Sequence, residues 1–167
     1  MNAPEPPPKP GTIKRSLARL AAVQALYQID LNDAPVETVL EELRDRGADE
    51  EGFGEADDEL FADIVQGCLA NRDDLDGMLN TALEPDWTLA RLEVVLRAVL
   101  RAGAYELLAR QEIPARVVLN EYVDLAHAFF AAKEPSLVNA VLDRVARRLR
   151  PEELSDREKP EANAAPR

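Results

Sequence analysis

Few residues in this chain are of the types that carry out catalysis or hold metal ions. Cys68 is the single cysteine and His127 the single histidine among 167 residues. A single cysteine excludes an internal disulfide and a multi-cysteine metal site. With a single histidine as well, a His-rich zinc site and an ordinary Ser–His–Asp triad are nearly excluded. Cys68 falls on the apolar face of an expected helix, which favours core packing over nucleophilic chemistry. His127 shares a polar helical face with Asn120 and Asp124, and we interpret it as surface.

Charged residues are distributed unevenly along the chain. The segment 41–63 holds eleven acidic and two basic residues, so it contributes −9 of the net charge of −12. The overall acidity argues against a nucleic-acid partner attracted by the field of the whole molecule. Basic residues elsewhere are grouped, so local positive patches are compatible with an acidic protein. The groups are Lys14, Arg15 and Arg19; Arg91, Arg97 and Arg101; and Arg144, Arg147, Arg148 and Arg150.

The acidic loop expected over residues 48–55 has the composition of a calcium loop but not its spacing. With Gly52 at the sixth position of an EF-hand, Gly47 would have to supply the first ligand, and glycine has no side chain to do so. We therefore expect a solvated acidic loop.

Helices must position these basic groups. The stretch 88–109 is expected to form the central helix of the fold. Residues 88–109 are apolar around most of a helical wheel, which predicts the buried central helix of a helical protein. Arg91, Arg97 and Arg101 interrupt this stretch and exclude a membrane span. Arg97 and Arg101 lie four residues apart and share one face, where the helix must reach the surface.

Helical periodicity also covers most of the remaining chain. The expected helices are 13–31, 35–47, 57–70, 72–83, 88–109, 115–130 and 137–149. No strand pattern and no internal repeat is present, so the sequence predicts an all-α bundle of about seven helices. Trp87, the only tryptophan, follows a Pro-Asp break and is expected to pack where subdomains meet.

The two ends of the chain lack this periodicity. Residues 1–11 are proline-rich and 151–167 are charged without pattern, so we expect a disordered tail on each side of a single domain over 12–150. No apolar run follows a basic start, which predicts no signal peptide and a cytoplasmic protein.

Two stretches are more specific than helical periodicity requires. The first, over residues 19–28, reads RLAAVQALYQ. The second begins at Arg97 as RAVLRAGAYEL and continues with Ile113-Pro114, Val118 to Glu121, Leu125-Ala126 and Val138 to Asp143. With these motifs in order from about Lys14 to about Leu149, the chain resembles the NusB family of bacterial transcription antitermination factors.

The resemblance implies a fold of two orthogonally packed three-helix subdomains and a role that is not enzymatic and needs no cofactor. It implies pairing with NusE, a ribosomal protein, and binding of the heterodimer to single-stranded boxA RNA in ribosomal RNA leaders. This complex would act with NusA, NusG and RNA polymerase. The resemblance leaves open whether the protein alone is a monomer or a homodimer.

The same resemblance implies residues for RNA contact, where arginines suit phosphates and unpaired bases. They are Lys14, Arg15, Arg19, Arg97, Arg101 and Lys133. From their spacing alone, Lys14, Arg15 and Arg19 could equally form a solvated helix face that does not bind RNA. For Arg101 the alternative is an intramolecular ion pair, for instance with Glu121 or Asp124.

The partner surface implied by the family draws on Leu96, Arg116 and Glu121. Glu121 keeps the family's residue type and could pair with a basic residue of NusE. Leu96 and Ala115 depart from the acidic and tyrosyl side chains usual at those positions, so local contacts must differ.

Two further functions fit a helical domain of this kind. A NusB-like domain precedes the catalytic part of an rRNA cytosine methyltransferase family, but this chain has no glycine-rich cofactor loop and no catalytic cysteine motif. The other possibility is a protein–protein module without RNA binding.

Overall fold

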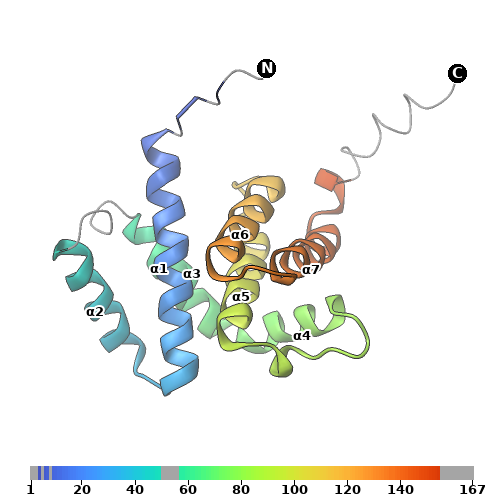
Figure 1. Cartoon of the computed structure of the whole chain (residues 1–167), viewed down its shortest axis with the longest axis horizontal. Coiled ribbons are helices and arrows are strands. Elements are labelled where there is room, and N and C mark those ends of the chain that lie inside the picture. The colour runs from blue at the N-terminus through green and yellow to red at the C-terminus, as the bar shows by residue number, and fades with distance from the viewer. Residues whose placement is uncertain (1–3, 5, 8, 50–56, 155–167) are drawn as a thin grey trace, which may run out of the picture. The chain divides into compact units, whose positions relative to one another are not determined.

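The computed structural model describes residues 4, 6, 7, 9–49 and 57–154, and all regular structure within them is helical. The α-helices are α1 (Pro10–Asn32), α2 (Val36–Asp49), α3 (Asp58–Ala70), α4 (Arg72–Ala82), α5 (Val94–Ala109), α6 (Ala115–Phe129) and α7 (Glu134–Leu149) (Figure 1). A short 3-10 helix, η2 (Leu89–Arg91), precedes α5. The predicted all-α fold class is confirmed. No helix among the described residues is long and apolar enough to cross a membrane.

The chain divides into two compact units, Met1–Val65 and Gln66–Arg167. In the first unit α2 packs against α1, to which a short turn connects it (Figure 1). Asp33 in this turn adopts a left-handed conformation with φ of 52°, which ends α1.

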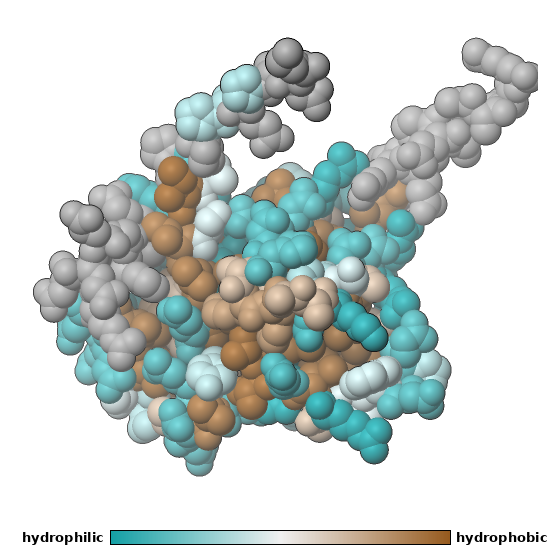
Figure 2. Space-filling model, viewed as in Figure 1, coloured by the Kyte–Doolittle hydropathy of each residue, from teal (hydrophilic) through white to brown (hydrophobic). Residues whose placement is uncertain are grey.

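The buried face of α1 differs from the predicted one. Periodicity favoured the long apolar residues, yet Ile13 and Leu31 are exposed and Leu17 and Leu20 are only half-buried. Apolar residues along α1 are accordingly visible in Figure 2. The buried face consists mainly of small residues, which allow a neighbouring helix to approach closely. It comprises Ala18, Ala21, Ala22, Val23, Ala25 and Leu26, together with Arg19.

The second and third helices keep their predicted apolar stripes. Val39, Leu40 and Leu43 of α2 are buried, and Cys68 of α3 is buried as core packing predicts. α2 does not end at Gly47 but continues to Asp49. The rest of the predicted acidic loop lies outside the described residues.

In the second unit α5 is the central helix. It packs against α4, α6 and α7, and α7 also packs against α4 and α6 (Figure 1). Every residue from Ala98 to Leu107 is buried, which confirms the prediction of a central helix that is apolar nearly all round. The helix begins later than expected. Leu89 lies in η2 and Leu92 directly after it, so neither residue belongs to α5.

Small residues allow the close packing around α5. A Cβ added at Gly103 would lie 2.6 Å from Leu142 Cδ1 and 3.3 Å from Tyr122 Cδ2. A Cβ added at Gly67 of α3 would overlap the ring of Tyr105. Glycine avoids a clash at both positions, with the rigid ring of Tyr105 at Gly67 and with the movable end of the Leu142 side chain at Gly103.

Three further expectations differ from the structure. Trp87 is 54% exposed instead of packed at a junction. Pro10 and Gly11 belong to α1, so the predicted N-terminal tail is shorter than eleven residues. Residues 151–154 form another helical turn with Leu154 buried, whereas a patternless tail was expected from Pro151. The rest of that tail lies outside the described residues.

Candidate nucleic-acid and partner interface

The start of α1 presents two exposed cations beside an uncapped helix N-terminus. Lys14 and Arg15 are exposed, and an added Cβ at Gly11 would meet Arg15 Nη1 at 3.5 Å, so the guanidinium lies along the first turn. Among the described residues no side chain caps this helix, and its first turn carries no acidic residue. Pro10 has no N–H, and the N–H groups of Thr12 and Ile13 donate to the Lys9 carbonyl, so anions are favoured here by the helix dipole and by the two cations.

The first turns of α1 also fix the start of α3. The backbone N–H of Asp57 donates to the Lys14 carbonyl at 3.0 Å, and Asp57 Oδ1 accepts from the N–H of Leu60 at 3.1 Å. Asp57 thus caps α3 while its backbone holds that cap against α1. This connection positions the backbone that carries Lys14.

Arg19 differs from its two neighbours in the basic group, because it is only 1% exposed. A guanidinium buried to this extent has no face on which an unpaired base can stack. The structure therefore buries Arg19 and leaves Lys14 and Arg15 as the exposed cations of this group.

Arg97 lies at the start of α5 and holds the turn that precedes it. Its Nη1 donates to the carbonyls of Ala90 at 3.1 Å and of Leu92 at 2.9 Å. The side chain is half-buried. These hydrogen bonds fix η2 against α5. One nitrogen of the guanidinium, Nη1, is therefore already hydrogen-bonded within the protein.

Arg101, one turn further along α5, forms an ion pair within the protein. Its Nε donates to Asp76 Oδ1 at 2.7 Å and its Nη2 to Asp76 Oδ2 at 3.1 Å, in the bidentate geometry that arginine and carboxylate favour. Arg101 is 9% exposed. The sequence raised an intramolecular ion pair as the alternative, with Glu121 or Asp124 as examples, and in the structure its partner is Asp76 of α4. The predicted arginine face of the central helix is therefore largely internal.

The remaining predicted residues lie on α5, on α6 and before α7. Arg116 is exposed at the start of α6 and makes no hydrogen bond or ion pair with the described residues. Glu121 is half-buried one turn later, and Lys133 is exposed at the N-cap of α7. Leu96 is buried, so it supports the surface from within instead of contacting a partner directly.

Sequence reasoning missed a cluster after α7 that holds the corner between α5 and α6. Arg150 is 4% exposed and donates to the carbonyls of Glu106, Leu107, Arg110 and Ile113 at 2.5–3.1 Å. It therefore binds carbonyls at and just after the end of α5, two of which, those of Glu106 and Arg110, also accept a backbone N–H.

Glu153 completes this cluster and fixes the start of α6. Its Oε1 lies 3.3 Å from Arg150 Nη1, and its Oε2 accepts the N–H of Ala115 at 2.9 Å. We call Arg150, Glu153 and the buried Leu154 the C-terminal clasp. It positions the first turn of α6, where Arg116 lies, and no local pattern signals it because its contacts reach 37–44 residues back along the chain.

A buried polar pair joins α5 to α6. The Tyr122 hydroxyl donates to the Glu106 carboxylate, and both side chains are fully buried. Polar groups removed from water must be hydrogen-bonded, so this pair fixes the register of the two helices.

The fold and the site define a class of protein: a small helical binding protein with exposed cations at helix starts. No group of three or more His, Cys, Asp or Glu residues in the described part of the chain could hold a metal ion. Residues 16–147 match the NusB family. The chain belongs to this family, whose members are transcription antitermination proteins and not enzymes.

Relatives and solved structures agree with this assignment. A transcription antitermination protein NusB from Bradyrhizobium sp. strain BTAi1 is 49% identical over 145 residues, covering 84% of this chain and 86% of the relative. One from Rhodopseudomonas palustris strain BisB18 is 44% identical over 158 residues, covering 92% and 94%. NusB of T. maritima superposes with a TM-score of 0.72 at 30% identity, covering 93% of this chain and 99% of that one.

A further neighbour is a NusB crystallised with NusE and double-stranded RNA. It has a TM-score of 0.67 and 22% identity, and it covers 79% of this chain and 95% of that one. At this identity the likeness shows a common fold.

Proposed function

We propose that this protein pairs with NusE and binds the boxA element of nascent ribosomal RNA as a transcription antitermination factor. The heterodimer then helps to assemble a complex with NusA, NusG and RNA polymerase in the cytoplasm. Membership of the NusB family supports the proposal, as does the neighbour that was crystallised with NusE and RNA. The two relatives are named as antitermination proteins, so nothing favours the methyltransferase alternative.

One observation carries the RNA-binding part of the proposal. Lys14 and Arg15 are exposed at a helix start that, among the described residues, has neither a capping side chain nor an acidic residue in its first turn. In a protein with a net charge of −12, such a local site is what allows contact with phosphates. Lys133, exposed before α7, adds a further cation to the proposal.

The partner-binding part rests on α6. Arg116 is exposed and unpaired with respect to the described residues, and Glu121 is half-buried on the same helix. Arg116 follows Ala115, whose N–H is held by the C-terminal clasp, so its backbone is fixed before any partner binds. We propose that these two side chains contact NusE.

The test is fluorescence anisotropy with labelled boxA RNA and the NusE heterodimer at several salt concentrations. Replacing both Lys14 and Arg15 by Ala should weaken binding and make the slope of log K against log salt shallower by about 1.4, which is about 0.7 for each phosphate of single-stranded RNA that is no longer neutralised. The matched control is Arg44→Ala with Arg91→Ala, which removes two exposed cations elsewhere. Equal salt slopes for the two double variants would show that RNA is not held at the start of α1.

The same measurement separates RNA binding from a pure protein–protein role. A heterodimer that forms normally but binds boxA RNA no better than an unrelated RNA would identify a protein–protein module.

A further inference from the structure

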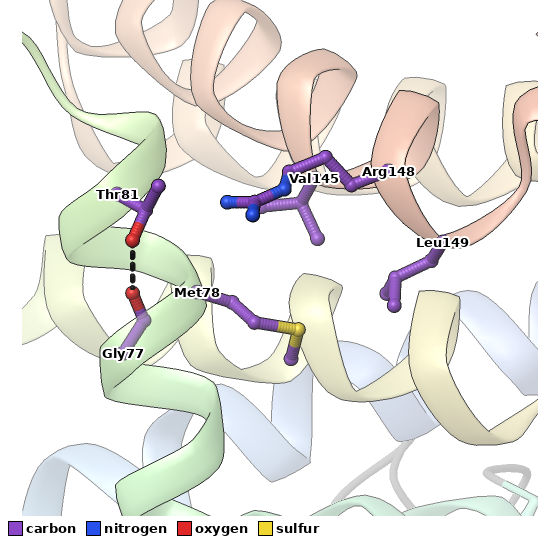
Figure 3. A pocket seen from close by; sticks show the side chains of 6 residues that line it. All are labelled: Gly77, Met78, Thr81, Val145, Arg148 and Leu149. Atoms are coloured by element: carbon purple, nitrogen blue, oxygen red, sulfur yellow. Dashed lines mark hydrogen bonds between the residues drawn. The ribbon is translucent and has the colours of Figure 1, made fainter.

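A groove between α4 and α7 is lined by none of the residues proposed above for RNA or NusE. It encloses about 330 Å³, the size of a small-ligand pocket. Its lining comes from one stretch of each helix, and Figure 3 shows these side chains facing one another across an open space. The residues are Gly77, Met78 and Thr81 from α4 and Val145, Arg148 and Leu149 from α7.

The α4 wall is apolar and unobstructed. A Cβ added at Gly77 would meet no atom within 4 Å, so the groove is open directly above the backbone. Met78 is half-buried and adaptable in shape. The Thr81 hydroxyl donates to the Gly77 carbonyl at 2.9 Å, which already uses its proton (Figure 3).

The α7 wall adds two apolar residues and one available cation. Val145 is buried and Leu149 half-buried, whereas Arg148 is exposed and its guanidinium points toward α4 (Figure 3). Arg148 makes no hydrogen bond or ion pair with the described residues. The other exposed arginines of α7 are engaged, Arg144 with the Ala82 carbonyl at 2.6 Å and Arg147 with Asp143 at 2.8 Å.

We propose that this groove docks a short segment of a partner protein in which a large aliphatic side chain stands next to a carboxylate. The aliphatic side chain fills the apolar space over Gly77 and Met78, and the carboxylate pairs with Arg148. Burial of apolar surface supplies the affinity, and the guanidinium sets the orientation of the segment.

The charges around the groove favour a protein segment over RNA. Affinity for RNA grows with the number of phosphates neutralised, and the described lining of the groove offers one available cation. Asp73 and Asp74 are exposed on α4, one turn before Gly77, and would repel a phosphate backbone. A single carboxylate held at Arg148 meets less of this repulsion than a chain of phosphates.

The chain's own C-terminal segment is a poor occupant. Residues 155–167 contain no Leu, Ile, Val, Met or aromatic residue, so they offer no side chain for the apolar space. The proposal therefore commits to a different polypeptide and does not depend on RNA or NusE binding.

The test uses a minimal probe and a spectroscopic reporter inside the groove. N-acetyl-leucine carries both proposed features, and N-acetyl-leucinamide lacks the carboxylate. The chain has two methionines, Met1 and Met78, so protein labelled with 13C at the methionine methyl groups gives one signal from the groove and one reference signal. Met78→Leu assigns the two.

We expect N-acetyl-leucine to shift the Met78 signal with a dissociation constant of about 1–10 mM, as ligand size predicts. The amide should bind about threefold to fivefold more weakly, the range for one exposed ion pair. Arg148→Ala should reduce the affinity for N-acetyl-leucine to that of the amide, whereas Arg147→Ala, outside the groove, should leave it unchanged.

Gly77→Leu places an aliphatic side chain in the groove and should abolish the shift. Because an added Cβ there meets nothing and leucine favours a helix, this variant should fold at least as stably as the wild type and should bind boxA RNA with NusE normally. Equal binding of acid and amide would overturn the proposal, as would a Met78 signal that does not shift at probe concentrations well above the expected dissociation constant. A Met78 shift caused by a short oligouridylate, or by raising the protein concentration alone, would overturn it in favour of RNA or a second copy.

Discussion

Replacing each of three helical glycines by alanine separates packing from helix propensity. Gly67, Gly77 and Gly103 lie inside α3, α4 and α5, and all three belong to the unit Gln66–Arg167. In a helix interior, alanine is favoured over glycine by about 1 kcal/mol. This gain is common to the three substitutions, so any difference among them reports what the new methyl group meets.

The structure predicts a different result for each site. At Gly77 an added Cβ meets no atom within 4 Å, so Gly77→Ala should stabilise the protein by about 1 kcal/mol. At Gly103 it would lie 2.6 Å from the Leu142 side chain, which must move, and overpacking of about 2 kcal/mol leaves a net loss of about 1 kcal/mol. At Gly67 it would overlap the rigid ring of Tyr105, so the net loss should be about 2 kcal/mol or more.

The assay is urea unfolding followed by circular dichroism, with the slope of the transition checked to be the same for all variants. A double-mutant cycle identifies the cause, because Tyr105→Ala should remove most of the cost of Gly67→Ala. Similar free-energy changes at all three sites, or a cost at Gly67 that persists without the Tyr105 ring, would refute the packing argument.

Three further substitutions test the polar contacts by urea unfolding, the last of them also by amide exchange. Tyr122→Phe removes the donor to the buried Glu106 carboxylate and should cost about 1–3 kcal/mol; a cost below about 0.5 kcal/mol would contradict the role of the pair. Asp76→Ala leaves Arg101 without its bidentate partner and should cost about 2–3 kcal/mol, more than Asp143→Ala, which removes the partner of the exposed Arg147. Arg150→Ala removes the donor to four carbonyls and should cost about 3 kcal/mol while amide exchange quickens at Ala115; unchanged exchange there would show that the C-terminal clasp does not hold the start of α6.

Hydrophobic periodicity predicted those features of the fold that depend on the spacing of apolar residues within a single helix. It indicated the all-helical fold, a buried central helix within residues 88–109, the buried Cys68 and the exposed polar face around His127. It was wrong for the buried face of α1, because the pattern of long apolar residues outweighed the alanines that pack inside.

The sequence could not predict contacts between residues that lie far apart along the chain. Asp76 pairs with Arg101 across 25 positions, and Arg150 reaches carbonyls 37–44 residues away. Backbone carbonyls carry no signature in the sequence, so an arginine that binds them looks the same as a surface arginine. For this reason the basic groups could be named from the sequence, but only the structure separates the exposed Lys14 and Arg15 from the buried Arg19.

The central claim is that this acidic protein binds boxA RNA as a heterodimer with NusE. Its net charge of −12 opposes RNA binding by the protein alone, so the partner should supply much of the favourable charge. Fluorescence anisotropy with labelled boxA RNA, with and without NusE at the same salt concentration, tests this directly. We predict binding that is tighter by at least about tenfold with NusE, and equal affinity in the two titrations would contradict the claim.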